Sequence, residues 1–217
     1  MKYNNHNIEN LLFDLGGVII DLDRERSVRN FTQLGMTDAD QMLGLYRQAD
    51  VFLELEEGRI SVDEFLAKLR AYFTRPVTDE QIDEAFSSFL LGIPTERLRA
   101  LESLKEHFSL YVLSNTNALM FRELIPNMFT TLGHDMDYYF KGCIKSYEVH
   151  ASKPEAKIFE ITQQQLGITP ENTLFFDDSQ ANVDAARALG WNAELVPPGT
   201  QFMDIVKKLW PELPLNY

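Results

Sequence analysis

Five polar residues follow short apolar segments in four separate parts of the chain. Asp14 ends the run LLFD, Ser114 ends YVLS, and Asp177 and Asp178 end LFFDD. Lys153 lies in SKPEAKIF, just before a helical pattern. If the three carboxylates lie close together, they repel one another unless a cation lies between them. Because Mg²⁺ prefers carboxylate, carbonyl and water oxygens, the set predicts a magnesium site.

The same residues provide partners for a phosphate group. Lys153 can neutralise a phosphate, and the hydroxyl of Ser114 can donate a hydrogen bond to a phosphate oxygen. Gly16 and Gly17, directly after Asp14, allow tight turns that would expose a backbone carbonyl or N–H to the ion and the ligand. These residue types indicate phosphoryl transfer, in which one carboxylate can attack phosphorus and form an aspartyl phosphate.

Each of these residues has an ordinary structural explanation when it is taken alone. An aspartate after a strand often caps a helix, adjacent acids are usually solvated, and a lone serine or lysine is most often a turn or surface residue. Their joint occurrence favours function, because ligands of open parallel sheets bind beyond the carboxyl ends of the strands. The four histidines show no metal-ligand spacing, and we expect Cys143 to be a small buried hydrophobic residue.

The elements that position these residues alternate between strands and helices. Short apolar runs predict buried parallel strands at 11–15, 109–115, 173–178 and, more weakly, 192–196. Helical patterns cover 95–108, 154–167 and 179–190, with Ser179 as an N-cap and Gly167 and Gly190 as C-terminal stops. This alternation predicts an α/β fold, a doubly wound Rossmann-like core with a parallel sheet.

Residues 24–95 interrupt this alternation, and we expect helices and no strand there. The clearest helix is SVDEFLAKLRAYF at 61–73, where Ser61 and Glu64 form a capping box and apolar residues recur on one face. We therefore expect a small all-helical domain at 24–95, inserted into a core domain formed by 1–23 and 96–217. The connection at 15–24 is the expected hinge.

The composition restricts the partners and the compartment. Of the 217 residues, 45% are hydrophobic and 24% charged, which is ordinary for a globular protein. The formal net charge of −13 makes nucleic acid and anionic membranes poor partners. We find no signal peptide and no apolar run of about 18 residues, and the single cysteine fits a reducing compartment, so we expect a cytoplasmic protein. It is expected to be a monomer or a weak homodimer.

Four segments, in order, resemble the motifs of the haloacid dehalogenase-like (HAD) hydrolase superfamily: FDLGGVIID, VLSNTN, SKPEAKIF and FFDDSQANV. The resemblance spans residues 8–23 and 96–210, and 24–95 is similar to the small helical cap of this superfamily. The segment ELEEGRISVDEF resembles a capped subgroup that includes α-D-glucose-1-phosphate phosphatases. The resemblance implies a Mg²⁺-dependent phosphatase of a small phosphorylated metabolite, with a sugar phosphate such as glucose 1-phosphate as one candidate.

The resemblance also implies a role for each matching residue. Asp14 would be the nucleophile, and Lys153 and Ser114 would complete the catalytic set. The implied ligands are Asp14, the carbonyl of Gly16, Asp178 and Asp177 for Mg²⁺, and Ser114, Asn115, Lys153 and Gly17 for the phosphate. Asn182 would brace the loop that carries the two adjacent aspartates.

One position departs from the pattern of most phosphatases in this superfamily. They have a second aspartate two residues after the nucleophile, which acts as general acid and base, and this chain has Gly16 there. General acid–base catalysis is worth about 10²–10⁴-fold. The leaving group could depart without a proton, as from an anomeric sugar phosphate, or another carboxylate could substitute. The candidates for substitution are Asp21, Asp23, Glu54 and Glu57. Alternatively, the protein is a non-catalytic phospho-ligand binder or a regulatory HAD-like protein.

Overall fold

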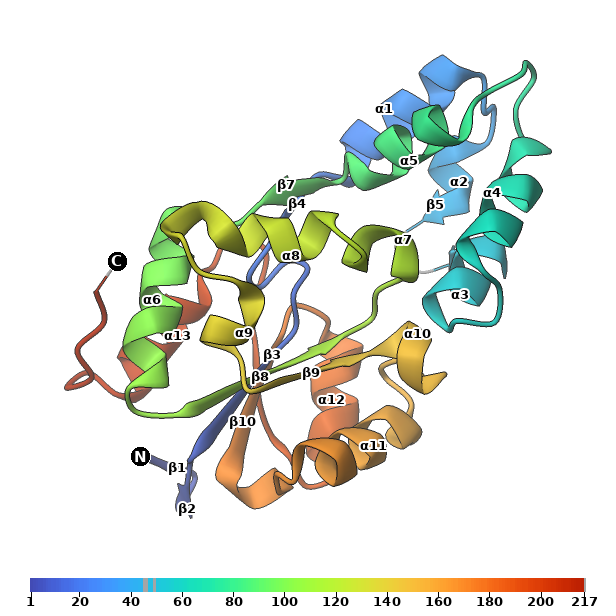
Figure 1. Ribbon diagram of the computed structural model, residues 1–217. Coiled ribbons are helices and arrows are strands. Elements are labelled where there is room, and N and C mark those ends of the chain that lie inside the picture. Colours follow the sequence, from blue (N-terminus) through green and yellow to red (C-terminus); the bar gives the residue numbers. More distant parts are fainter. Residues whose placement is uncertain (45–46, 49, 217) are drawn as a thin grey trace.

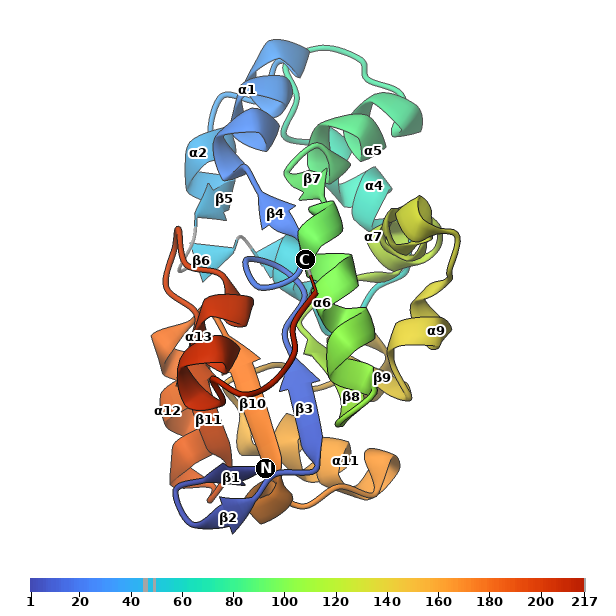
Figure 2. The ribbon, with the colours of Figure 1, turned by 90° about the vertical axis from the view of Figure 1, so that its left-hand side faces the viewer.

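A five-stranded parallel sheet forms the centre of the molecule (Figures 1 and 2). The structure is a computed structural model, which describes residues 1–44, 47–48 and 50–216. In the order β11-β10-β3-β8-β9, the sheet contains β3 (Asn10–Phe13), β8 (Ser109–Ser114), β9 (Gly142–Lys145), β10 (Thr173–Asp177) and β11 (Asn192–Leu195). All neighbouring pairs are parallel. The predicted doubly wound core is therefore confirmed.

Both faces of the sheet are covered by helices, which explains why its strands are apolar. One face packs against α6 (Thr95–Lys105) and α13 (Phe202–Leu209), and the other against α11 (Ala156–Leu166) and α12 (Gln180–Ala188). Phe13 of β3 stacks on Phe176 of β10, and Phe202 packs edge-on against Phe13, with ring centroids 5.2 Å apart in both pairs. On the opposite face, Phe159 packs against Phe175.

The register of the central strands brings the polar residues to one edge. Phe13 pairs with Phe176 in β10 and with Val112 in β8. Asp14 follows β3 directly, and its backbone N–H donates to the carbonyl of Phe176 at 2.9 Å. Because all three strands run in the same direction, Asp14, Asp177 and Ser114 lie at the same end of the sheet.

A layer of helices between residues 24 and 88 lies beyond this end of the sheet (Figure 1). It contains α1 (Arg24–Leu34), α2 (Ala39–Met42), α3 (Asp50–Glu56), α4 (Val62–Arg70) and α5 (Asp79–Ser87). Its interior is aromatic, because Phe31, Phe52, Phe65 and Phe86 contact one another with centroids 5.1–6.5 Å apart. The capping box of Ser61 and Glu64 begins α4, as predicted.

The expectation that residues 24–95 contain no strand is wrong. An antiparallel ribbon of β4 (Asp21–Leu22) and β7 (Leu90–Gly92) connects the helical layer to the sheet, and the hairpin β5 (Leu43–Gly44) and β6 (Arg47–Gln48) lies within the layer. These strands have only two or three residues, so no alternation can identify them. Residues 45–46 and 49, in the expected cap, and 217, in the expected core, lie outside the described residues.

Several further elements connect the larger ones. They are β1 (Lys2–Tyr3), β2 (His6–Asn7), α7 (Ala118–Phe121), α8 (Leu124–Met128), η1 (Phe129–Leu132), α9 (Met136–Tyr139), α10 (Ser146–Val149) and η2 (Pro170–Asn172). The predicted strands and helices end within a few residues of the observed ones. Gly167 ends α11 in a left-handed conformation, whereas Ser179 begins α12 without a side-chain cap bond. Among the described residues, no helix has the length and apolar character needed to cross a membrane.

Candidate active site

Lys153 lies at the centre of a buried charged cluster at the end of the sheet. Its Nζ is 2.8 Å from Oδ1 of Asp14, 2.7 Å from Oδ2 of Asp177 and 2.9 Å from the carbonyl oxygen of Leu113. The side chains of Lys153 and Asp177 are 1% and 0% exposed. The three N–H groups of the ammonium therefore have three acceptors, which fix the lysine between the two aspartates.

The charges of this cluster shift its pKa values. Burial alone would lower the pKa of Lys153, but the charges of Asp14 and Asp177 outweigh burial and raise it to about 12. Burial raises the pKa of Asp14 to about 7 despite the opposing charge of Lys153, and Asp177 and Asp178 add to the increase. Burial, followed by the charge of Asp177, also raises the pKa of Asp178. Three ionised carboxylates beside one ammonium would leave the cluster with a net negative charge.

A divalent cation would balance this excess. Asp14, Asp177 and Asp178 each provide a carboxylate oxygen, and these oxygens lie within 4.8 Å of one another. Asp177 is already held by the protein, because its Oδ1 accepts hydrogen bonds from the backbone N–H of Ser179 and from Nδ2 of Asn182, both at 2.9 Å. Asn182 therefore braces this loop, as expected. A set of hard oxygen donors of this kind fits Mg²⁺.

The two glycines after Asp14 allow the chain to pass close to this cluster. Gly17 has a φ of +72°, and a Cβ there would lie 2.2 Å from Oδ2 of Asp178. Glycine is thus required at this position by both its backbone conformation and its neighbour. Gly16 lies outside the left-handed region, and a Cβ there would meet Cδ1 of Leu22 at 3.2 Å. Leu22 therefore occupies the space beside Gly16.

The loop after β8 is tied to the loop that carries Lys153. The side chain of Asn115 donates from Nδ2 to the carbonyl of Lys153 at 3.0 Å and accepts from its backbone N–H at 2.8 Å. Ser114 is 3% exposed at the end of β8. The buried hydroxyl of Ser146 accepts from the N–H of Thr116 at 3.0 Å. The segment 114–116, which was expected to bind phosphate, is therefore held in place from two sides.

Part of this cluster lines a cavity of about 330 Å³ between the sheet and the helical layer, which we call the Asp14 cavity. Its walls include Asp14, Gly16, Ser114, Asn115 and Asp178 from the sheet side, and Phe52, Glu56, Phe86 and Phe89 from the helical side. A site of paired carboxylates, a lysine and a hydroxyl at the base of a partly apolar cavity can hold a phosphate ester with its organic part toward the helices.

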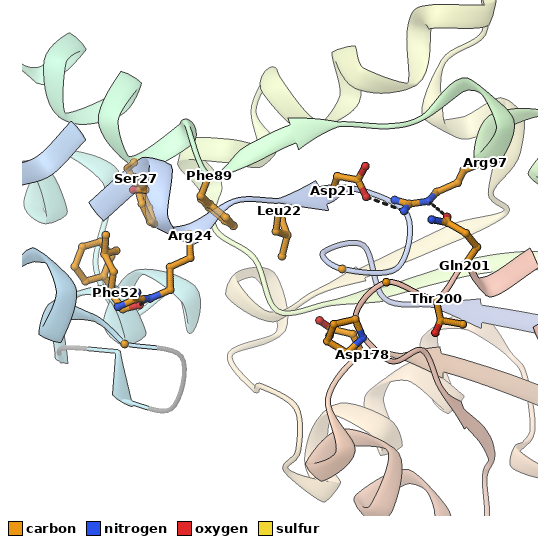
Figure 3. Close-up of a pocket in the computed structure, with 16 residues that line it drawn as sticks. Asp21, Leu22, Arg24, Ser27, Phe52, Phe89, Arg97, Asp178, Thr200 and Gln201 are labelled. Atoms are coloured by element: carbon orange, nitrogen blue, oxygen red, sulfur yellow. Dashed lines mark hydrogen bonds and ion pairs between the residues drawn. The ribbon is translucent and has the colours of Figure 1, made fainter. Parts of the chain in front are cut away.

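A second cavity of about 510 Å³, which we call the Arg97 cavity, lies beside the first (Figure 3). Leu22 and Asp178 line both cavities. The buried Arg97 lines the Arg97 cavity. It donates from Nε to the side chain of Gln201 at 2.7 Å and from Nη1 to the carbonyl of Ile19 at 2.9 Å. Its Nη2 lies 2.7 Å from Oδ1 of Asp21.

The four carboxylates proposed from the sequence as substitutes for the missing aspartate lie elsewhere. Asp21 pairs with Arg97 in the second cavity, Asp23 caps α1, Glu54 pairs with Lys68 at 2.6 Å, and Glu57 pairs with Arg59 at 2.7 Å. Among the residues that the structure describes along the Asp14 cavity, none of the four appears, whereas Glu56 does. Glu56 follows Phe52 by four residues and shares its helix face, but the sequence alone does not show that this face lines the cavity.

Comparisons with known proteins agree with this geometry. Residues 8–190 match the sequence profile of haloacid dehalogenase-like hydrolases. A D-ribitol-5-phosphate phosphatase of Bacteroides thetaiotaomicron is 34% identical over 184 residues, covering 85% of this chain and 89% of the relative. The HAD family enzyme BT-2542 of the same species, solved with magnesium and inorganic phosphate, has a TM-score of 0.86 and 37% identity, covering 92% of this chain and 99% of that chain.

A further solved structure extends the likeness to another species. It is described as a predicted HAD-like family hydrolase of Porphyromonas gingivalis, with a TM-score of 0.86 and 35% identity, and the match covers 94% of this chain and 98% of that chain. The four motifs, the parallel sheet with its carboxylate cluster and these matches lead to the same assignment. The chain therefore belongs to the haloacid dehalogenase-like hydrolase family.

Proposed function

We propose that this chain hydrolyses the phosphate monoester of a small polyol or sugar, with Asp14 as the nucleophile. It is a HAD-family phosphatase that uses Mg²⁺, as its family and its phosphatase and magnesium-bound relatives indicate. The observation that carries the proposal is the cluster of Asp14, Lys153, Asp177 and Asp178, of which Asp14 and Asp178 line the Asp14 cavity.

The contacts of the cluster suggest how its residues would act. Lys153 holds Oδ1 of Asp14, so the second carboxylate oxygen remains for in-line attack on phosphorus. The hydroxyl of Ser114 and the loop that follows it would bind phosphate oxygens, and Asp178 would be the main further metal ligand. The bound Mg²⁺ would supply the charge neutralisation that phosphoryl transfer requires. Water would then hydrolyse the aspartyl phosphate and regenerate Asp14.

Two observations support a polyol or sugar as the organic part. A relative that is 34% identical is named for D-ribitol 5-phosphate. The two adjacent cavities, of about 330 and 510 Å³, have room for a five- or six-carbon chain, and Ser27, Thr200 and Gln201 add polar groups to the aromatic walls of the Arg97 cavity. Glucose 1-phosphate, expected from the resemblance at the sequence level, remains a candidate beside the primary phosphate esters.

We also propose that residues 24–95 act as a cap over a core formed by 1–23 and 96–217. Phe52 and Phe86 of the helical layer, together with Phe89 just after it, line both cavities, so this segment forms the wall opposite the carboxylate cluster. Closure of such a wall over a bound substrate would exclude water from the site and select the organic part.

The experiment that tests the function is phosphate release from a panel that includes D-ribitol 5-phosphate, glucose 1-phosphate and glucose 6-phosphate, with Mg²⁺ or with EDTA. Asp14→Asn should abolish Mg²⁺-dependent release, whereas the control Asp204→Asn, on the exposed face of α13, should retain it. Release by Asp14→Asn would contradict the nucleophile assignment. Mg²⁺ binding without release from any substrate would favour the non-catalytic alternative.

A further inference from the structure

The replacement of the usual second aspartate by Gly16 leaves the departing alkoxide of a primary phosphate ester without a proton donor. We propose that Glu56, at the C-terminal end of α3, is the general acid and base of this site. The inference rests on the proposed function, because it assigns a residue to that reaction. It also brings a catalytic group from the helical layer into a site whose other residues lie in strands β8 and β10 or in loops at the end of the sheet.

Glu56 lies on the wall of the Asp14 cavity. Among the described residues that line the Asp14 cavity, three are acidic: Asp14, Asp178 and Glu56. Asp14 and Asp178 belong to the carboxylate cluster that binds the cation. Glu56 alone of the three comes from the helical layer, the side toward which in-line attack by Asp14 drives the leaving oxygen.

The backbone of Glu56 is fixed to the segment that follows β9. The hydroxyl of Ser146 lies 2.7 Å from the carbonyl oxygen of Glu56 and 3.0 Å from the N–H of Thr116. One buried side chain therefore contacts both the end of α3 and the segment that follows Ser114. A Cβ on Gly58 would lie 2.1 Å from the carbonyl oxygen of Tyr147. The turn after Glu56 therefore also packs directly on α10.

The surroundings of Gly16 exclude the other nearby candidates. Leu22 occupies the space beside Gly16, so an apolar side chain stands where the usual aspartate would extend. Asp21 is bound to Arg97 and lines the other cavity (Figure 3). The proton must therefore come from a different wall of the Asp14 cavity, and Glu56 is the acid that the structure describes there.

The proposed step balances without any additional reactant. Asp14 forms a bond to phosphorus, the bond from phosphorus to the ester oxygen breaks, and the protonated carboxyl of Glu56 gives its proton to that oxygen as the alcohol leaves. The carboxylate of Glu56 then takes a proton from the water that attacks the aspartyl phosphate. This second attack breaks the bond between phosphorus and Asp14, and it releases inorganic phosphate.

The test compares Glu56→Gln with Glu54→Gln, a matched change two residues earlier on the same helix, where the side chain pairs with Lys68. Each variant is assayed on the primary alkyl phosphate that the wild type hydrolyses best and on p-nitrophenyl phosphate, whose leaving group departs without a proton. For Glu56→Gln, kcat/KM should fall about 10²–10⁴-fold on the alkyl phosphate and less than about tenfold on the aryl phosphate. Glu54→Gln should change neither value.

Two further measurements separate catalysis from folding. The decline of kcat/KM at high pH on the alkyl phosphate should disappear in Glu56→Gln, because its amide has no proton to lose. If Glu56→Gln does not fold, Glu56→Asp retains the acid on a shorter side chain and should show a smaller loss with the same contrast between substrates. Adding Gly16→Asp to Glu56→Gln should restore part of the rate, because Gly16 lies outside the left-handed region and the three atoms nearest to an added Cβ belong to the side chain of Leu22.

An equal loss on both substrates, or an unchanged kcat/KM for Glu56→Gln, would overturn the assignment. The same experiment separates this result from failure of the proposed function. If the wild type releases no phosphate with Mg²⁺, the proposed function itself is wrong. If the wild type is active and Glu56→Gln is equally active, only the assignment of Glu56 is wrong.

Discussion

Replacement of Lys153 by methionine tests how much the ammonium of Lys153 stabilises the buried carboxylates of the site. The ammonium is within 2.8 Å of Asp14 and 2.7 Å of Asp177, and the side chains of Lys153 and Asp177 are 1% and 0% exposed. Methionine has a similar length but leaves both carboxylates without their partner. Removal of one member of a buried ion pair costs about 3–5 kcal/mol. We therefore expect Lys153→Met to lower the free energy of unfolding by this amount near neutral pH.

The same variant should show a characteristic dependence on pH. The charge of Lys153 lowers the pKa of Asp14, so its loss raises the folded-state pKa of that carboxyl further. A carboxyl whose pKa is higher when folded than when unfolded binds more protons in the folded state, so stability increases as the pH falls. The difference between wild type and Lys153→Met should therefore be larger at pH 8 than at pH 5.

The assay is urea unfolding in EDTA at both pH values. Lys157→Met is the matched control, because Lys157 lies four residues later and is exposed, with Nζ donating to the carbonyl of His150. Its unfolding free energy should stay within about 0.5 kcal/mol of the wild type. The reasoning is refuted if Lys153→Met unfolds at the same urea concentration as the wild type, or if its deficit is the same at pH 5 and pH 8.

Two further predictions concern the metal site. Gly17→Ala should weaken the Mg²⁺ response of phosphate release about 10–100-fold, since its Cβ would lie 2.2 Å from Asp178, whereas Gly133→Ala, at φ +82° in open space, should retain it. Burial raises the pKa of Asp14 from 3.8 to about 7. The free energy of unfolding in EDTA should therefore decline as the pH rises through this range, because the folded protein binds more protons than the unfolded chain. Asp14→Asn should remove that part of the decline in thermal unfolding. A normal Mg²⁺ response in Gly17→Ala, or parallel stability curves for wild type and Asp14→Asn, would contradict these predictions.

The sequence predicts the central strands well because each is a buried apolar run that stops at a polar residue. It does not predict β9, whose residues GCIK begin with glycine and end with lysine at the edge of the sheet. The ribbon of β4 and β7 is missed for a different reason. Its strands have two and three residues and exist only because Asp21 and Leu22 meet Gly92 and Leu90, which are distant in the sequence.

The candidate site could be predicted as a set of residues but not as a network of contacts. The apolar runs and the motifs place Asp14, Lys153 and Asp177 at one end of the sheet, yet they do not indicate that the lysine bridges both aspartates. They also do not separate Glu54, Glu56 and Glu57. Which of these faces the cavity depends on the rotation of α3, and that rotation is set by the contacts of Phe52 with phenylalanines of α1, α4 and α5.

The contacts of Arg97 determine which part of the connection between the sheet and the helical layer can act as a hinge. Arg97 binds the carbonyl of Ile19, the carboxylate of Asp21 and the side chain of Gln201, and the turn at 15–20 is closed by its own hydrogen bonds and almost entirely buried at 18–20. Most of the hinge expected at 15–24 is therefore held by Arg97 of α6. We expect the helical layer to swing about 22–24 and 89–92 alone, so that opening for product release leaves the nucleophile and the cation site assembled for the next substrate.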